Sequence, residues 1–153
     1  MQQDADEAED RDLAASEALR QRARRLYLRA RDYGLRGLEL DHPGFEKALR
    51  ENAASAVLAA GTGDVPFLYW TAASWGAVIS LSKDDPDLLA DLPLVEALLR
   101  RGLELEEGYD SGALHEFLIT FEGSRSDTMG GSAGKARQHF DRAMELSGGD
   151  RAA

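Results

Sequence analysis

The chain has 153 residues, of which 43% are apolar and 30% are charged, and its formal net charge at pH 7 is −10. This composition is typical of one globular domain, and no run approaches the roughly 18 uninterrupted apolar residues that a membrane helix needs. The negative charge argues against nucleic acid as a partner, because phosphate contacts need a basic surface. The chain has no cysteine, which excludes disulfides, thiolate metal sites and cysteine nucleophiles.

Residues 1–12 form an acidic segment that we expect to be frayed or disordered. A secretory signal peptide would place lysine or arginine here, followed by an apolar run, whereas this segment is rich in aspartate and glutamate. The sequence as written therefore shows no export signal. Two interpretations stay open: the protein remains inside the cell, or Met1 is not its natural start.

Helical patterns begin near Leu13 and continue to a break at residues 41–43. The proline of this break suits the first turn of a second helix, which we expect to end near Ala60. We expect Asp64 to cap a third helix, with Pro66 in its first turn. This half of the chain therefore has the start and stop signals of consecutive helices.

The second half of the chain has the same kinds of helix start and stop signals. After a break at residues 84–86, Pro93 starts a helix that we expect to reach about Glu107. We expect Ser111 to cap a short helix, and Ser132 to start the last helix after a glycine- and serine-rich loop. Because the connections are short, consecutive helices are expected to be antiparallel neighbours.

A five-residue phrase recurs at the ends of the expected helices. Residues 36–40 and 101–105 both read Arg-Gly-Leu-Glu-Leu, and residues 142–146 are a relaxed copy. The small second residue of the phrase would let a neighbouring helix approach closely. Because the copies are unequally spaced, we predict an all-α fold of antiparallel helical hairpins in a degenerate tetratricopeptide-repeat-like array. One domain is expected over residues 13–149, with residues 150–153 as a tail.

The first expected helix carries a stripe of arginines. There are seven of them: Arg20, Arg22, Arg24, Arg25, Arg29, Arg31 and Arg36. Such a stripe indicates either an attraction for an acidic partner or an ordinary solvated face. Both interpretations stay open from the sequence.

Residues 67–79 are apolar on almost every side of the helix that they are expected to form. Such a helix belongs in the middle of an assembly. It is either a core helix or the wall of an apolar ligand channel, in which the indole N–H groups of Trp70 and Trp75 and the Tyr69 hydroxyl would orient the ligand.

His115 and Glu116 are the residues that most resemble a catalytic pair. A zinc protease helix would need a second histidine at the position of Ile119, and adjacent helical residues do not face each other. We therefore interpret the pair as hydrogen-bonded groups at a helix contact or pocket edge. Residues 130–135 lack the complete phosphate-loop pattern, since Met129 stands where its first glycine belongs. The sequence predicts no enzyme, no cofactor and no metal site.

Four phrases together carry a family resemblance. They are residues 31–36, 69–76, 113–118 and 135–143. In this order and at these separations they resemble the T component of tripartite ATP-independent periplasmic (TRAP) transporters, called TatT. The resemblance extends from about residue 23 to residue 149.

The resemblance implies an all-helical, tetratricopeptide-like protein that is exported to the periplasm as a lipoprotein and has no known enzymatic activity. It also implies association into homotrimers, an apolar pore in each subunit, and contact with the substrate-binding P component of the transporter. By this resemblance Tyr69, Trp70 and Trp75 are candidates for a ligand-facing wall, and His115 and Glu116 for its polar edge.

The chain also departs from the family pattern. Family members have a lipid-attachment cysteine and further helices on both sides of the matching block, so this chain resembles the middle portion of such a protein. Membrane attachment would occur only through a lipid anchor that this sequence lacks. We expect a non-catalytic accessory component of TRAP-type uptake that binds the P component and a small apolar or carboxylated ligand.

Two other hypotheses remain. The first is a generic tetratricopeptide-like scaffold for protein–protein interaction, which would favour asparagine and lysine on a concave face; the chain has few of either. The second is an enzyme that uses His115 and Glu116, which the sequence supports least.

Overall fold

The computed structural model of the chain describes residues 2–123 and 131–149. Within these ranges the ordered elements are helices, and no strand occurs. The prediction of an all-α fold is confirmed. The expected tail, residues 150–153, and most of the loop before Ser132 lie outside the described residues.

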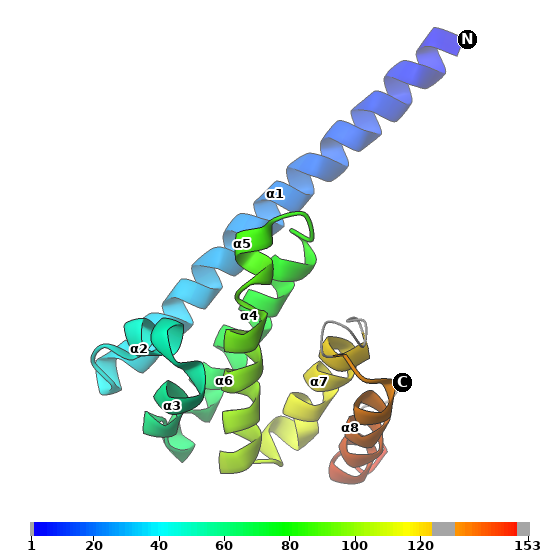
Figure 1. The fold of residues 1–153 in the computed structure, drawn as a ribbon. Coiled ribbons are helices and arrows are strands. Elements are labelled where there is room, and N and C mark those ends of the chain that lie inside the picture. The colour runs from blue at the N-terminus through cyan, green and yellow to red at the C-terminus, as the bar shows by residue number, and fades with distance from the viewer. Residues whose placement is uncertain (1, 124–130, 150–153) are drawn as a thin grey trace.

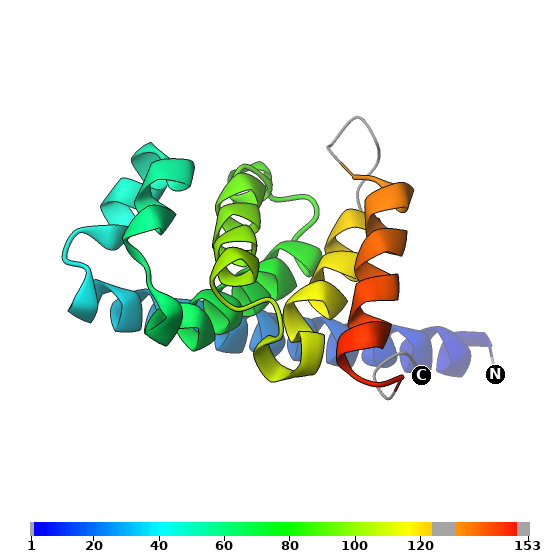
Figure 2. The same ribbon diagram turned by 90° about the horizontal axis from the view of Figure 1, so that it is seen from below.

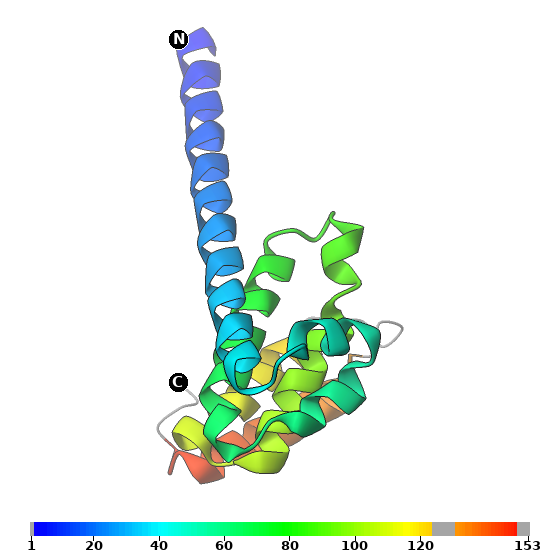
Figure 3. The same ribbon diagram turned by 90° about the vertical axis from the view of Figure 1, so that its left-hand side faces the viewer.

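Three long helices form the centre of the molecule. Helix α4 (Val65–Ser80) packs against α1 (Gln2–Asp41) on one side and against α6 (Leu92–Leu105) on another. Figure 1 and Figure 3 show that the amino-terminal half of α1 extends beyond the other helices. None of the described helices combines the length and apolar character that crossing a bilayer requires.

The remaining helices lie on either side of this centre. One group follows α1 and consists of α2 (Phe45–Glu51), α3 (Ala53–Ala56) and the short 3₁₀ turns Val57–Ala59 and Thr62–Asp64. The short α5 (Pro86–Leu89) precedes α6, and the second group consists of the 3₁₀ turn Tyr109–Gly112, α7 (Ala113–Gly123) and α8 (Ala133–Leu146). Figure 2 shows these helices side by side, with α8 at the end of the row.

Helix α4 supplies more buried apolar side chains than any other described helix. Its buried apolar side chains are Val65, Leu68, Ala72, Trp75, Val78 and Ile79. The close approach of α1 depends on two glycines: a Cβ on Gly34 would overlap Thr71, and a Cβ on Gly37 would overlap Phe67. The small residue in the first copy of the repeated phrase therefore does allow a neighbouring helix to come close.

Local signals placed several helix starts correctly. Pro66 lies in the first turn of α4, as expected. At the expected break of residues 84–86, Asp85 caps the short α5, which was not predicted, by accepting a hydrogen bond from the Leu88 N–H at 3.2 Å. Ser132 caps α8, since its hydroxyl accepts from the Lys135 N–H at 3.2 Å. Each cap or first-turn proline acts within one helical turn, so the residues that it needs lie close together in the sequence.

Three expectations about helix boundaries were wrong. The second helix does not continue to Ala60, because Asn52 is extended (φ −155°) and caps a new helix by accepting from the Ser55 N–H at 3.1 Å. Asp64 does not cap α4; its carboxylate accepts from the Gly61 N–H at 2.8 Å. Ser111 does not cap α7, because it lies inside a 3₁₀ turn with φ 55°.

Asp64 instead joins two segments. Its Oδ2 lies 2.9 Å from Nε2 of His42, at the end of α1. Burial raises the pKa of this carboxyl, but the hydrogen bonds from Gly61 and His42 lower it by more, so the pKa lies below its ordinary value. Asp64 was expected to cap α4, the helix that follows it. Its carboxylate instead stabilises the turn before that helix and links the turn to His42.

Candidate functional site

The five site residues predicted from the sequence take part in different groups of contacts. Trp75 is fully buried, whereas Trp70 is 61% exposed. Tyr69 is half-buried, with its ring centroid 5.1 Å from that of Trp70 and 5.6 Å from that of Tyr109. His115 is buried between α7 and α8 (below), and Glu116 is exposed on α7. The structure does not gather these residues into one pocket.

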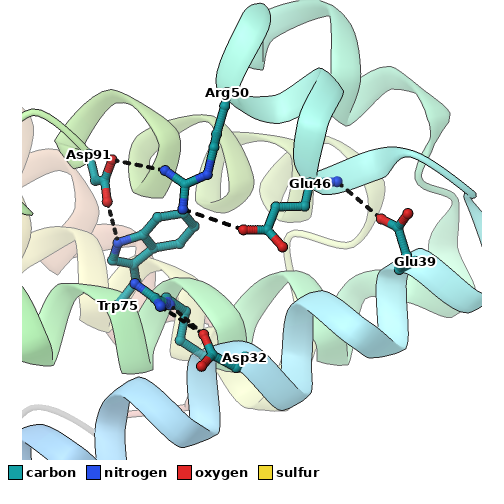
Figure 4. Close-up of polar contacts among 7 residues, drawn as sticks. Asp32, Glu39, Glu46, Arg50, Trp75 and Asp91 are labelled. Carbon is teal, nitrogen blue, oxygen red and sulfur yellow. Dashed lines mark hydrogen bonds and ion pairs between the residues drawn. The ribbon is translucent and has the colours of Figure 1, made fainter.

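Trp75 lies at the centre of a layer formed by charged side chains. Its indole N–H donates to Oδ2 of Asp91 at 3.1 Å, and Asp91 also pairs with Arg50 at 3.5 Å (Figure 4). The guanidinium carbons of Arg31 and Arg50 lie 5.0 Å and 5.5 Å from the ring centroid. These contacts satisfy the one polar group of a buried ring, so Trp75 acts as a core residue.

The outer face of α1 carries a row of exposed apolar side chains beside a row of arginines. The apolar row is Leu19, Leu26, Tyr33 and Leu40, each more than half exposed. The arginine row is Arg22, Arg25, Arg29 and Arg36, and no carboxylate among the described residues pairs with them. Two of these guanidiniums lie over the ring of Tyr33, at 5.8 Å and 4.3 Å from its centroid. This surface is called the α1 outer face below.

An apolar cavity of about 500 Å³ opens between α4, the α5–α6 segment and α7. Its lining residues are Ala73, Gly76, Ala77, Ile79, Ser80, Lys83, Leu89, Leu92, Phe117, Thr120 and Phe121. It exists because α4 presents small side chains to α7. A Cβ on Gly76 would come within 2.7 Å of the Phe117 ring, so the glycine lets that ring lie against the helix.

Polar groups in this cavity are few. Lys83 is exposed, and it forms no hydrogen bond or ion pair with the described residues. The Ser80 hydroxyl donates to the Ala77 carbonyl at 2.8 Å, and Thr120 supplies a second hydroxyl. An apolar pocket with one cation and two hydroxyl groups fits a small molecule with an apolar body and a negatively charged end.

The sequence analysis predicted an apolar helix at residues 67–79 but did not predict this cavity or its phenylalanines. The recurrence of phenylalanine four residues apart was the available signal, since such residues share one face of a helix. That this face meets the small residues of α4 follows from tertiary packing.

His115 joins a polar network at the contact between α7 and α8. Its Nδ1 lies 2.8 Å from Nδ1 of His139, and its Nε2 lies 3.2 Å from Oε1 of Glu107. Arg142 donates to both oxygens of Glu107, at 2.8 Å and 2.9 Å. The hydrogen bonds from Arg142, with that from His115, lower the pKa of Glu107 from 4.5 to about 2.

This network identifies the partners of His115. The carboxylate that lies 3.2 Å from its Nε2 is that of Glu107. The packing of α8 brings the ring of His139, 24 positions along the chain, against that of His115. Among the described residues no group of three or more histidines and carboxylates is arranged to hold a metal ion.

Comparisons with known proteins give one family. A family model described as the TRAP transporter T-component matches residues 1–153. An uncharacterized protein of Treponema pallidum (strain Nichols) is 32% identical to the chain over 124 residues. That alignment covers 78% of this chain and 38% of the relative, so the chain spans well under half of the relative's length.

Proposed function

The chain belongs to the TRAP transporter T-component family, and on this premise we propose that it is a non-catalytic periplasmic component that binds the transporter's substrate-binding P component. The family supports an accessory role in TRAP transport. The observation that carries the finer proposal is the α1 outer face, which combines exposed apolar side chains with arginines that no described carboxylate neutralises. Such a surface fits a protein partner that presents apolar side chains flanked by carboxylates.

Two exposed aromatic side chains of α4 are further candidates for the partner surface. Trp70 is 61% and Phe67 is 42% exposed, and Phe67 contacts α1 at Gly37. Exposed aromatic side chains and arginines are the residue types that most often dominate binding energy at protein interfaces. We therefore assign Trp70 to the partner surface, together with Leu26 and Tyr33 of α1.

Titration calorimetry with the P component encoded beside this gene tests the proposal. Tyr33→Ala and Trp70→Ala are each expected to weaken binding by about tenfold or more, since central aromatic contacts contribute over about 1 kcal/mol. Leu58→Ala is the matched control, because Leu58 is 62% exposed but lies in the Val57–Ala59 turn. Absence of heat and of co-elution would overturn the proposal.

We further propose that the α4–α7 cavity binds the small apolar or carboxylated ligand. Its volume of about 500 Å³ lies in the range that suits small molecules. Phe117 and Phe121 would contact the apolar body, and Lys83 would pair with the carboxylate. In this proposal the ligand lies against these residues, and Trp75, whose side chain is fully buried, supports the core beneath.

Binding of decanoate, compared with decanol, tests the ligand site. Ala77→Leu is expected to fill the cavity and to weaken decanoate binding by about tenfold or more, because a leucine side chain occupies the volume that the ligand needs. Lys83→Gln is expected to remove the preference for decanoate over decanol, whereas Lys47→Gln, at an exposed lysine paired with Glu51 at 3.8 Å, should not. Decanoate binding that neither Ala77→Leu nor Lys83→Gln changes would exclude this cavity.

The proposal includes the homotrimer that the family resemblance implies. Light scattering on the purified chain measures its oligomeric state directly. A mass of three chains would support the trimer, and a monomer at all concentrations would contradict it.

A further inference from the structure

Helix α8 has fewer buried side chains than α4, α6 or α7 among the described residues. It packs on α7 and on the turn Tyr109–Gly112, and Ala143 is its buried residue among those described. Its polar contacts to the rest of the domain include the Arg142–Glu107 pair and the ring contact between His139 and His115. These polar contacts therefore add to the packing of α8 on α7.

The hydrogen bonds of His115 determine where the protons lie. A carboxylate accepts hydrogen bonds and cannot donate them, so Nε2 of His115 carries the hydrogen that Glu107 receives at 3.2 Å. In a neutral ring Nδ1 of His115 is then an acceptor. The 2.8 Å contact between the two Nδ1 atoms therefore requires a hydrogen on Nδ1 of His139.

The contact tolerates one additional proton but not two. A proton added at Nε2 of His139 leaves its Nδ1–H donating to His115, and the bond becomes stronger because the donor is charged. A second proton can only go to Nδ1 of His115. It would place two N–H groups against each other at 2.8 Å and two imidazolium charges side by side, so the rings must separate.

Charged groups from every neighbouring segment face this pair. Glu107 contacts His115 and is itself paired with Arg142. Glu122 of α7 favours the charged form of His139, whereas Arg100 of α6 and Lys135 of α8 disfavour it. Burial, followed by the field of His115, lowers the pKa of His139 below its ordinary value despite the acidic neighbour. Protonation of His139 is therefore delayed to acidic pH.

We propose that the His115–His139 pair is an acid-operated latch that holds α8 against α7 while a single proton lies between the rings and releases α8 when both rings are charged. The latch would operate whichever partner or ligand the protein binds. Because α7 also carries Phe117 and Phe121, the latch lies on the helix that forms one wall of the cavity. Release of α8 would expose the α7 face that it covers.

Hydrogen exchange of the backbone amides tests the latch in the intact chain. As the pH falls from about 7 to below about 5, past the ordinary titration range of histidine, protection of α8 corrected for intrinsic exchange is expected to fall by about tenfold or more. Protection of α4 and α6 should change much less. Equal changes in all three helices would mean general acid unfolding and would overturn the proposal.

Two substitutions at His139 separate a latch from a merely structural contact. His139→Gln offers an amide that can donate to neutral His115 or accept from charged His115, so α8 should stay protected at both pH values. His139→Lys carries a permanent charge, so one protonation of His115 should release α8 and the transition should move to higher pH. The same pH response in wild type and His139→Gln would contradict the latch.

The third histidine supplies the control. His42 pairs with Asp64 at 2.9 Å in another part of the domain, so His42→Gln should leave the acid response of α8 unchanged. Nuclear magnetic resonance titration of the ring protons gives an independent measurement. We expect His115 and His139 to titrate in coupled steps, and independent single transitions for the two rings would overturn the proposal.

Discussion

The layer around Trp75 and the joint between α7 and α8 use similar side chains in opposite ways. Each contains an aromatic ring, arginines and a carboxylate. Around Trp75 the ring is fully buried, and the arginines of α1 and α2 cover it while Asp91 accepts from its N–H. At the α7–α8 joint the rings are titratable, and their mutual contact is itself the link between two helices.

This difference shows what each region is suited to do. The indole does not gain or lose charge near neutral pH, so the central layer is stabilised by burial and should respond little to mild acid. The imidazole pair has a bond whose existence depends on the number of bound protons. The layer around Trp75 therefore forms a framework that changes little with pH, whereas the contact between α7 and α8 is one that acid can open.

The largest expected effect is loss of the central ring. Trp75→Ala should lower the free energy of unfolding by about 3–5 kcal/mol, because it removes a fully buried aromatic side chain and leaves a cavity. Trp70→Ala, at an exposed ring of the same helix, should change stability by no more than about 0.5 kcal/mol. Denaturant unfolding measures the stability of both variants. Similar losses of stability for the two would contradict the assignment of Trp75 to the core and Trp70 to the surface.

The close approach of α1 and α4 gives the second prediction. Gly34→Ala should cost about 1–3 kcal/mol, because the added methyl group overlaps Thr71 and forces two packed helices apart. Gly63→Ala is the matched control, since a Cβ at Gly63 meets no atom within 4 Å. Thermal unfolding of the two variants is the measurement, and an unaltered Gly34→Ala would show that the helices shift freely.

The start of α8 gives a smaller effect at the edge of the molecule. Ser132→Ala should cost about 1 kcal/mol, because the Lys135 N–H loses the hydroxyl that accepts from it. Hydrogen exchange should place this loss mainly in α8, whose contacts with the centre are few. Ser16→Ala, at an exposed serine within α1, is a control for the substitution itself, and a loss spread evenly over α4 and α6 would contradict a separate edge.

The smallest effect concerns Glu107. Its pKa is lower in the folded chain than in the unfolded chain, so its contribution to stability is complete above pH 4.5 and is lost as the pH falls towards about 2. Both groups are partly exposed, so Arg142→Gln should lower the stability only slightly at neutral pH. In acid unfolding curves the wild type and the variant should differ above pH 4.5 and converge as the pH falls towards about 2, and equal stabilities above pH 4.5 would contradict the pairing.

Local physical rules explain how much of the fold follows from the sequence. Proline in a first turn, the Asp85 and Ser132 caps and the apolar run of α4 each depend on residues within a few positions of one another. Capping and helix propensity act over the same short distances. The all-α class, the burial of α4 and the ordered phrases of the family resemblance were therefore available from the chain itself.

Tertiary structure decided the features that give the molecule its candidate functions. The contact between His115 and His139 joins residues 24 positions apart, and the cavity needs the small residues of α4 to meet the phenylalanines of α7. Asp64 stood in a capping position, but a histidine from another segment changed its role. The sequence determined which segments become helices because that is a local balance of hydrogen bonds and burial. Which side chains then meet depends on how whole helices pack, and no short stretch of the chain contains that information.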